Sequence, residues 1–426
     1  MNQTSLKESK IINILVKKQK IINIGEVKMD YYILSVLAFF AIVAILIYRD
    51  RKNVEIKYIV FMRRTKRGIK FLDKIAKYKR FWKIFGTIGI FVGLYLMMNG
   101  VYTLVLYEKL LITGQVKQPG LSFVFPSPTS QTISGTGYIL LPFWFWIIII
   151  ASVIFPHELS HGILSRVGKI RVKSVGLLLV AIFPGAFVEP DEKQLKKAKF
   201  WNKMRIFAVG TFANFLVASF LFTPPINLGF ANFNLNLGLI PNVLWPAYVP
   251  GSIKIENVNS SSPAELAGLK PEMVITEIDG KELKLSYSEY IAGQTVLNKE
   301  LSKLKPGDKI ELIADEKPYT LALAGNPANK TSPYIGIVSK QIVRGNPDFV
   351  FGVLFQLLTW MWILNYTIAI VNISPLYPLD GGLMVEAIAE KITKRYAKKI
   401  TIIITLITLS IFLMNIITPL FTSALR

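Results

Sequence analysis

The chain has 426 residues, of which 52% are hydrophobic. That share excludes an ordinary soluble enzyme and indicates several membrane spans. The absence of cysteine excludes disulfides and thiolate ligands, and the formal charge of +23 indicates either a nucleic-acid partner or basic loops beside a membrane.

The N-terminal part is predicted to hold one span and a basic segment. The first apolar run is Tyr31–Tyr48, and Met29 lies just before it, which suggests the hypothesis that translation starts there. Residues 49–83 carry fourteen Lys or Arg side chains with apolar residues interleaved. This pattern predicts a basic helix on an anionic membrane surface, on the cytosolic side. Basic cytosolic loops therefore explain the charge, and we expect no nucleic-acid partner.

Five further apolar runs are long enough to span a bilayer. They are Ile84–Tyr107, Tyr138–Ile154, Ile206–Thr223, Phe349–Val371 and Ile400–Leu420. With the first run they give six spans, and the basic loops place both chain ends outside. The run Val175–Val188 is too short to span and lies between two basic clusters. With Pro184-Gly185 at its centre, the run predicts a re-entrant β-hairpin. Its backbone N–H and C=O groups need hydrogen-bond partners at membrane depth, so the hairpin must lie against protein or line a water-filled cavity.

The section between the fourth and fifth spans is polar and predicts a small outside domain. Residues 250–348 hold twelve Lys or Arg and thirteen Asp or Glu, so this section is nearly neutral. Ile253–Val258 and Val274–Ile278 read as strands, and Asp279-Gly280 reads as a turn after the second strand. Ser262–Gly268 predicts a short capped helix.

The strongest chemical motif is His157-Glu158-Leu159-Ser160-His161, and it holds the only two histidines of the chain. On a helix, residues four apart share one face, so both imidazoles can bind one metal ion. Glu158, beside the first ligand, can take a proton from water at the metal. Ionisable groups at the end of an apolar run are costly and are usually functional.

A catalytic zinc ion needs a third protein ligand. Asp380 is the best candidate, because it follows a Pro- and Gly-rich break at the cytosolic end of another span, where an unpaired carboxylate is costly. Three other acids compete with it, although their lysine-rich surroundings favour a solvated role. They are Glu189, Asp191 and Glu192.

Taken together, these motifs resemble the site-2 protease family of intramembrane zinc metalloproteases. The resemblance rests on five segments in the family's order: His157–Gly162, Pro184–Val188, Arg205–Gly210 with Asn214, Ser262–Gly280 and Asn372–Gly381. Ser262–Gly280 looks like part of a PDZ domain. The chain has Gly210-Thr211 where the family often has Gly-Pro, which leaves the backbone near Asn214 open.

The resemblance implies a mainly α-helical polytopic membrane protein, with about six transmembrane helices, a re-entrant β-hairpin loop and an inserted α+β PDZ-like domain. It implies one Zn²⁺ ion held by His157, His161 and Asp380, and Glu158 as the proton acceptor. It further implies that Asn214 and Asn372 hold the unwound substrate or the oxyanion, and hydrogen bonding between helices is the alternative for Asn214. We expect four parts, at residues 1–137, 138–223, 250–340 and 349–426.

The expected activity is hydrolysis of peptide bonds inside transmembrane segments of single-pass membrane proteins. We expect the chain in the lipid bilayer of the cell membrane, with the metal site near the cytosolic face and the PDZ-like domain outside. A non-catalytic scaffold that binds peptide tails through that domain is the alternative. A metal transporter is a weaker alternative, because a transporter needs polar residues along its whole path across the membrane.

Overall fold

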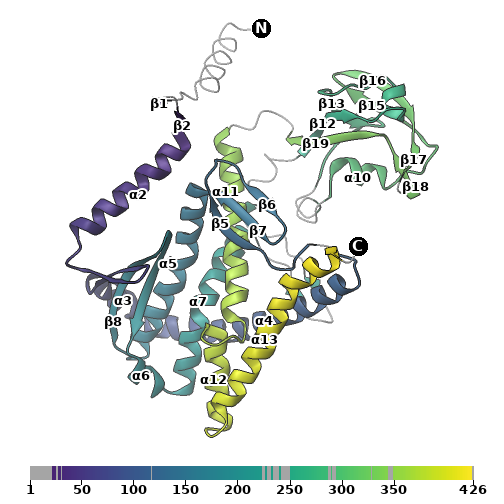
Figure 1. The fold of residues 1–426 in the computed structure, drawn as a ribbon. Coiled ribbons are helices and arrows are strands. Elements are labelled where there is room, and N and C mark those ends of the chain that lie inside the picture. The colour runs from purple at the N-terminus through teal and green to yellow at the C-terminus, as the bar shows by residue number, and fades with distance from the viewer. Residues whose placement is uncertain are drawn as a thin grey trace. The chain divides into compact units, whose positions relative to one another are not determined.

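The computed structural model describes residues 22–24, 27–29, 31–116, 118–222, 226–227, 232–233, 239–240, 250–285, 289, 294–327, 329–343 and 349–424. The chain divides into two compact units. Unit 1 comprises residues 1–217 and 363–426, and unit 2 comprises residues 218–362. Figure 1 shows the helices and strands of both units.

Six helices in the described residues are long and apolar enough to cross a membrane, which confirms the predicted number of spans. They are α2 (Tyr31–Arg49), α4 (Lys79–Ile112), α5 (Phe143–Val167), α7 (Phe200–Leu221), α11 (Phe349–Ile373) and α13 (Ala397–Ala424). Leu, Ile, Val and Phe side chains on all faces of these helices suit burial in lipid or against a neighbouring helix.

The predicted third span was wrong at its start. Residues Tyr138–Pro142 form strand β7 of a small sheet with order β5-β7-β6, and α5 begins only at Phe143. The other two strands are β5 (Phe123–Ser127) and β6 (Ile133–Gly135). His157 is therefore fourteen residues, about 21 Å, along the helix from its first residue (157 − 143 = 14).

The basic segment after α2 is not the single surface helix that we predicted. It forms two strands, β3 (Val54–Lys57) and β4 (Val60–Thr65), followed by one short helix, α3 (Arg67–Ala76). Strand β4 pairs antiparallel with β8 (Val172–Val180), which pairs with β9 (Phe183–Pro190). The four-stranded sheet has the order β3-β4-β8-β9, so the N-terminal segment is joined to the hairpin by backbone hydrogen bonds.

The hairpin of β8 and β9 has its turn earlier than Pro184-Gly185. Val180 pairs with Phe183, so the connection is Ala181 and Ile182, and Ala181 takes a positive φ of 53°. Pro184 and Gly185 lie in β9, which has no strand on its outer side among the described residues. A proline is compatible with such an edge strand, because its missing N–H would point away from the ladder.

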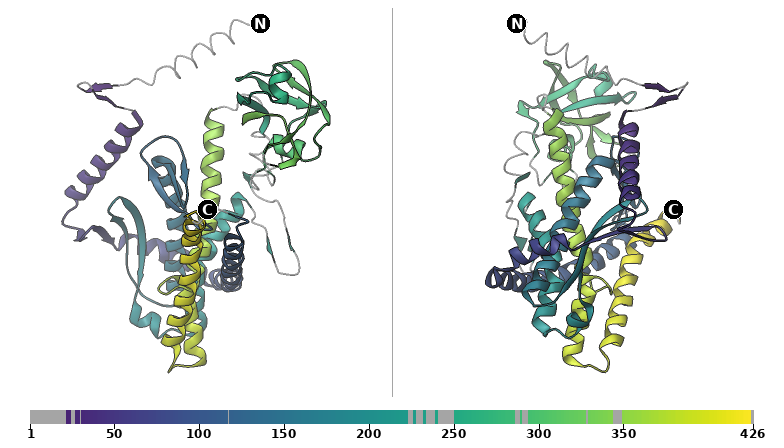
Figure 2. Two further views of the ribbon diagram at one scale, coloured as in Figure 1. Left: turned by 45° about the vertical axis from the view of Figure 1, so that its right-hand side comes forward. Right: turned by 90° about the vertical axis from the view of Figure 1, so that its left-hand side faces the viewer.

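The core of unit 1 lies where α3, α4, α5, α7 and the C-terminal helices meet. Its fully buried members include Leu72, Ile163, Met204, Ala208, Ile373 and Met384. After α11 the chain breaks and resumes as α12 (Asp380–Ile392), which packs against α13 in both views of Figure 2. The remaining short elements of unit 1 are β1 (Ile22–Ile24), β2 (Val27–Met29) and α6 (Glu192–Lys196).

Unit 2 contains a sheet with the order β16-β15-β13-β12-β19. The predicted strand 253–258 lies in β12 (Pro250–Val258) and the strand 274–278 is β13 (Val274–Ile278). Asp279 and Gly280 both have positive φ, as the predicted turn requires, and Ser262 caps helix α8 (Pro263–Leu266). The other described elements are β10 (Ile226–Asn227), β11 (Asn232–Phe233), β14 (Lys281–Glu282), α10 (Val296–Leu301), β15 (Lys309–Ala314), β16 (Lys317–Ala322), β17 (Ala324–Asn326), β18 (Asn329–Tyr334) and β19 (Ile337–Val343).

Candidate metal centre

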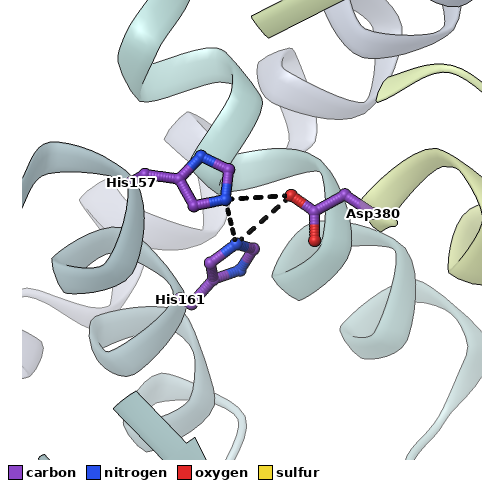
Figure 3. Close-up of side chains that lie close together, drawn as sticks. All are labelled: His157, His161 and Asp380. Atoms are coloured by element: carbon purple, nitrogen blue, oxygen red, sulfur yellow. Dashed lines mark hydrogen bonds and ion pairs between the residues drawn. The ribbon is translucent and has the colours of Figure 1, made fainter. Parts of the chain in front are cut away.

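Helix α5 places His157 and His161 on one face, as the spacing of four residues predicts. Their Nε2 atoms are 3.1 Å apart, and both rings are largely buried. Figure 3 shows the two rings facing the carboxylate of Asp380. Asp380 Oδ2 lies 3.3 Å from each Nε2 atom, so the side chains that the sequence singled out come together from α5 and α12.

The chain break before α12 brings Asp380 to the two histidines. The segment between Ile373 and Asp380 contains two prolines, which end α11 and separate it from α12. Gly381 then packs so closely on the end of α11 that an added Cβ would lie 1.8 Å from the carbonyl oxygen of Ile373. A residue without a side chain is therefore needed directly after Asp380.

The three donor atoms fit a metal ion. Four ligands held tetrahedrally at about 2.0–2.1 Å lie about 3.3–3.4 Å from one another, close to the three distances observed here. Asp380 Oδ2 is buried and accepts no hydrogen bond from the described residues. His157, His161 and Asp380 thus lie close enough together to bind a metal ion.

The tautomer of His161 is set by a backbone group. Its Nδ1 lies 2.6 Å from the carbonyl oxygen of Ile206 in α7, an acceptor only, so Nδ1 carries the proton. The Nε2 atom then presents a lone pair toward Asp380 and His157. Hydrogen bonds of this kind orient metal-binding histidines in proteins.

One face of α7 lines the site with three residues at a spacing of four. They are Ile206, Gly210 and Asn214. Helix α7 is continuous through Thr211, so the backbone near Asn214, which the resemblance left open, is helical. An added Cβ on Gly210 would lie 2.4 Å from His161 Nε2. Sequence reasoning did not recognise the roles of Ile206 and Gly210, although their spacing to Asn214 was the available signal.

Asn214 is buried beside the other histidine. Its side-chain Nδ2 lies 3.3 Å from His157 Nδ1, while its Oδ1 is buried without a partner among the described residues. With the amide turned the other way, Oδ1 would accept the Nδ1–H of His157, which leaves the Nε2 lone pair of that ring for a metal ion. Asn372 lies in the last turn of α11 and is partly buried.

Glu158 contacts the hairpin, a partner that the sequence did not reveal. Its Oε2 accepts a hydrogen bond of 3.1 Å from the backbone N–H of Val188 in β9. Val188 forms its cross-strand pair with Val175 at a position where the Val188 N–H points to the outer edge of β9. The carboxylate next to the metal ligands therefore lies against a strand edge.

The competing acids have other partners. Asp191 accepts the backbone N–H of Gln194 at 3.0 Å and so caps α6, and this hydrogen bond lowers the pKa of Asp191 below its usual value. Glu189 pairs with Arg64 of β4 and accepts a bond from Ser174. Glu192 lies in the first turn of α6. Among the described residues, the three-ligand cluster consists of His157, His161 and Asp380.

Comparisons with known proteins identify the family of this chain. The model of peptidase family M50 matches residues 145–415, more than half of the chain. An uncharacterized protein of Methanocaldococcus jannaschii is 26% identical over 365 residues, covering 83% of this chain and 85% of that protein. A membrane-bound transcription factor site-2 protease homolog of Arabidopsis thaliana is 30% identical over 186 residues, covering 43% of this chain and 32% of that protein. The chain belongs to peptidase family M50, the site-2 protease family.

Proposed function

We propose that this protein is an intramembrane zinc metalloendopeptidase that hydrolyses peptide bonds within transmembrane segments of single-pass membrane proteins. The observation that carries the proposal is the convergence of His157, His161 and Asp380 next to Glu158, in a family M50 chain with six apolar helices. The buried, unpartnered oxygen of Asp380 supports a bound cation.

The chain's own residues supply the proton transfers. Zinc, when bound by the three ligands, polarises the scissile carbonyl and lowers the pKa of a water molecule to about 7. Glu158 accepts the proton that the attacking water loses and later donates it to the leaving amine. The water oxygen bonds to the carbonyl carbon as the C–N bond breaks, which gives a new carboxylate and a new amine.

Asn214 and Asn372 have supporting roles in this proposal. The contact between Asn214 and His157 Nδ1 favours a positioning role, in which the amide oxygen holds the ring with its Nε2 toward the metal. Asn372 is partly buried in the last turn of α11, eight residues before Asp380 (380 − 372 = 8), and we assign it to contact with the unwound substrate or the oxyanion.

The substrate must be extended before it is cut, because an intact helix hides its carbonyl groups in hydrogen bonds. The outer edge of β9 offers backbone groups to which an extended segment can add as a further strand. Glu158 lies at this edge through its bond to Val188, so a strand added there is close to the metal site. We propose that the hairpin is re-entrant and that it holds the substrate.

Replacing Glu158 with Gln tests the function directly. We expect cleavage of a membrane-embedded reporter to fall by about 10²–10⁴-fold, while zinc content stays unchanged, because only the proton acceptor is removed. Zinc analysis and mass spectrometry of the products measure both. Glu192→Gln, on the exposed helix α6, is the matched control and keeps full activity. Cleavage by Glu158→Gln at the wild-type rate would refute the mechanism.

The proposed location is the cell membrane, with the metal site near the cytosolic face and the PDZ-like domain at residues 250–340 outside. The cluster of basic side chains around α3 supports a cytosolic position for that helix. In this cysteine-free chain, single cysteines at Lys66 and Lys270 should react with an impermeant thiol reagent from opposite sides of the membrane. Reaction of both from one side would contradict the location.

A further inference from the structure

A small apolar cavity opens beside Glu158. Its volume is about 280 Å³, and it lies within unit 1 between the β4-β8-β9 sheet and the helices α3 and α5. Helix α5 contributes Phe155, Glu158 and Leu159 to its wall. Helix α3 contributes Gly68, Phe71 and Leu72. The proposed proton acceptor thus lines a cavity to which the N-terminal segment also contributes side chains.

The strand register explains how the sheet forms the remaining wall. Two rows of directly paired residues cross β4, β8 and β9 on one face of the sheet, because paired residues share a face. The first row is Thr65, Val175 and Val188, and the second row is Arg63, Leu177 and Ala186. All six residues line the cavity. Gly176 and Phe187, which lie between the two rows, also line the cavity.

The size and chemistry of the cavity suit one apolar side chain. A helix is about 10–12 Å wide with its side chains, so a space of 280 Å³ cannot accept one. The volume is also just below the range of about 300–1,000 Å³ that is usual for whole ligands. Three large apolar side chains around the cavity are more than half exposed, namely Phe71, Phe155 and Leu177.

The cavity is continuous with the proposed peptide-binding edge. Val188 belongs to the first row, and its N–H donates to Glu158 at the outer edge of β9. A substrate strand beside β9 would extend these rows by one residue, so its side chain on this face would point toward the cavity. That residue would lie close to the bond that is cut, because Glu158 acts there.

We propose that this cavity is a specificity pocket, which accepts a bulky apolar side chain of the substrate next to the scissile bond. Strand β4 and helix α3 contribute five of its fourteen lining residues, although they lie outside the region that matches family M50. In this proposal the N-terminal segment helps to select the substrate sequence. The inference rests on the proposed function, because it assumes a peptide substrate at β9.

Two neighbouring residues of β8 provide a matched test. Leu177 faces the pocket, whereas Leu178 does not line it. Reporter segments carry Ala, Leu, Phe or Trp at each position around the cleaved bond. We expect the wild type to prefer a bulky residue at one position. Leu177→Ala should shift that preference toward Trp, and Leu178→Ala should leave the order of preference unchanged.

Filling the pocket should have the opposite effect. Ala186→Leu should reduce cleavage of the best bulky reporter by at least about 10-fold relative to the Ala reporter, a usual range for misfit in an apolar pocket. An equal reduction for all reporters would overturn the pocket assignment while leaving the protease function intact. The pocket assignment would also be overturned if Leu178→Ala changed the order of side-chain preference as much as Leu177→Ala does.

Crosslinking tests the pocket without any cleavage. In the cysteine-free chain, Phe71→Cys is combined with reporters that carry one cysteine at successive positions, in the presence of a chelator. We expect a disulfide with one reporter position and its neighbours on the same face, because the bond needs Cα atoms about 4.4–6.8 Å apart. Lys74→Cys, exposed on the same helix, is the control. Equal crosslinking at all positions, or none, would mean that the cavity holds lipid or no ligand.

Discussion

His157, His161 and Asp380 direct three electron-pair donors toward one point inside a bundle of apolar helices. Without a cation these lone pairs repel one another, and a buried carboxylate oxygen without a donor is costly. Gly210 leaves the space next to them free of any side chain. The surrounding residues are thus arranged for an ion at this point, which is the reason to expect large effects from single substitutions.

Asp380→Ala should sharply reduce the zinc content of the purified protein, because only two histidine ligands would remain. Asn214→Ala should lower the affinity for zinc by about 10–100-fold, the usual effect of losing the partner of a metal-binding histidine. Asp191→Ala is the control for Asp380, since that carboxylate caps α6. Full zinc content in Asp380→Ala, measured by mass spectrometry of the metal, would exclude Asp380 as a ligand.

The three residues of the cluster could be predicted because their signal is local or chemical. The two histidines are four residues apart, and Asp380 follows a visible helix break. The partners of these side chains could not be predicted in the same way. The carbonyl of Ile206 and the N–H of Val188 belong to backbone groups that every residue has, so no residue type marks them.

At the scale of the elements, β4 connects the N-terminal segment to the hairpin. The two-residue turn makes Val180 and Phe183 exchange backbone hydrogen bonds. The backbone N–H and C=O groups of alternate residues of β8 therefore point toward β4. The bond from the Ala181 N–H to the Ile59 carbonyl, 2.8 Å long, agrees with this alternation. Phe61 therefore points its N–H toward β8, whereas Met62 points its N–H toward β3.

A pair of proline substitutions tests whether this pairing supports the site. Phe61→Pro removes a bond to β8 and should destabilise the pairing by about 1–3 kcal/mol. Hydrogen exchange of the β8 amides should become faster, and cleavage should fall. Met62→Pro removes a bond to β3 and should leave the exchange of β8 nearly unchanged. Equal exchange of β8 in both variants would mean that β4 does not stabilise the hairpin.

The pairing of β4 with β8 was beyond sequence reasoning for a physical reason. The paired residues are more than 100 positions apart, and the alternation of β4 is hidden among charged residues that also fit a surface helix. Strand β7 was missed because an apolar stretch next to an apolar helix has no periodicity that separates the two. The six spans were predictable, since length and hydropathy alone define them.

At the scale of the whole molecule, the chain enters and leaves the sheet of unit 2 on neighbouring strands. Pro250 at the start of β12 is paired with Val343 at the end of β19. The two ends are therefore only about 5 Å apart, the usual distance across an antiparallel pair. The sheet between them has its own buried residues, among them Ile253, Ile275 and Leu312. Such an insertion can be removed without stretching the rest of the chain.

Deleting residues 250–343 and joining the ends with a short Gly/Ser linker should preserve zinc content and cleavage of a short reporter segment. His157, His161, Asp380 and Glu158 all belong to unit 1, so the deletion removes none of them. We propose that the PDZ-like domain binds an exposed chain end by adding a strand or excludes substrates with bulky outside parts. The deletion should therefore change which full-length substrates are cut, measured on a panel with outside domains of increasing size. Loss of zinc from a well-folded deletion variant would show that unit 2 contributes to the metal site, and an unchanged substrate range would show that the domain is only a spacer.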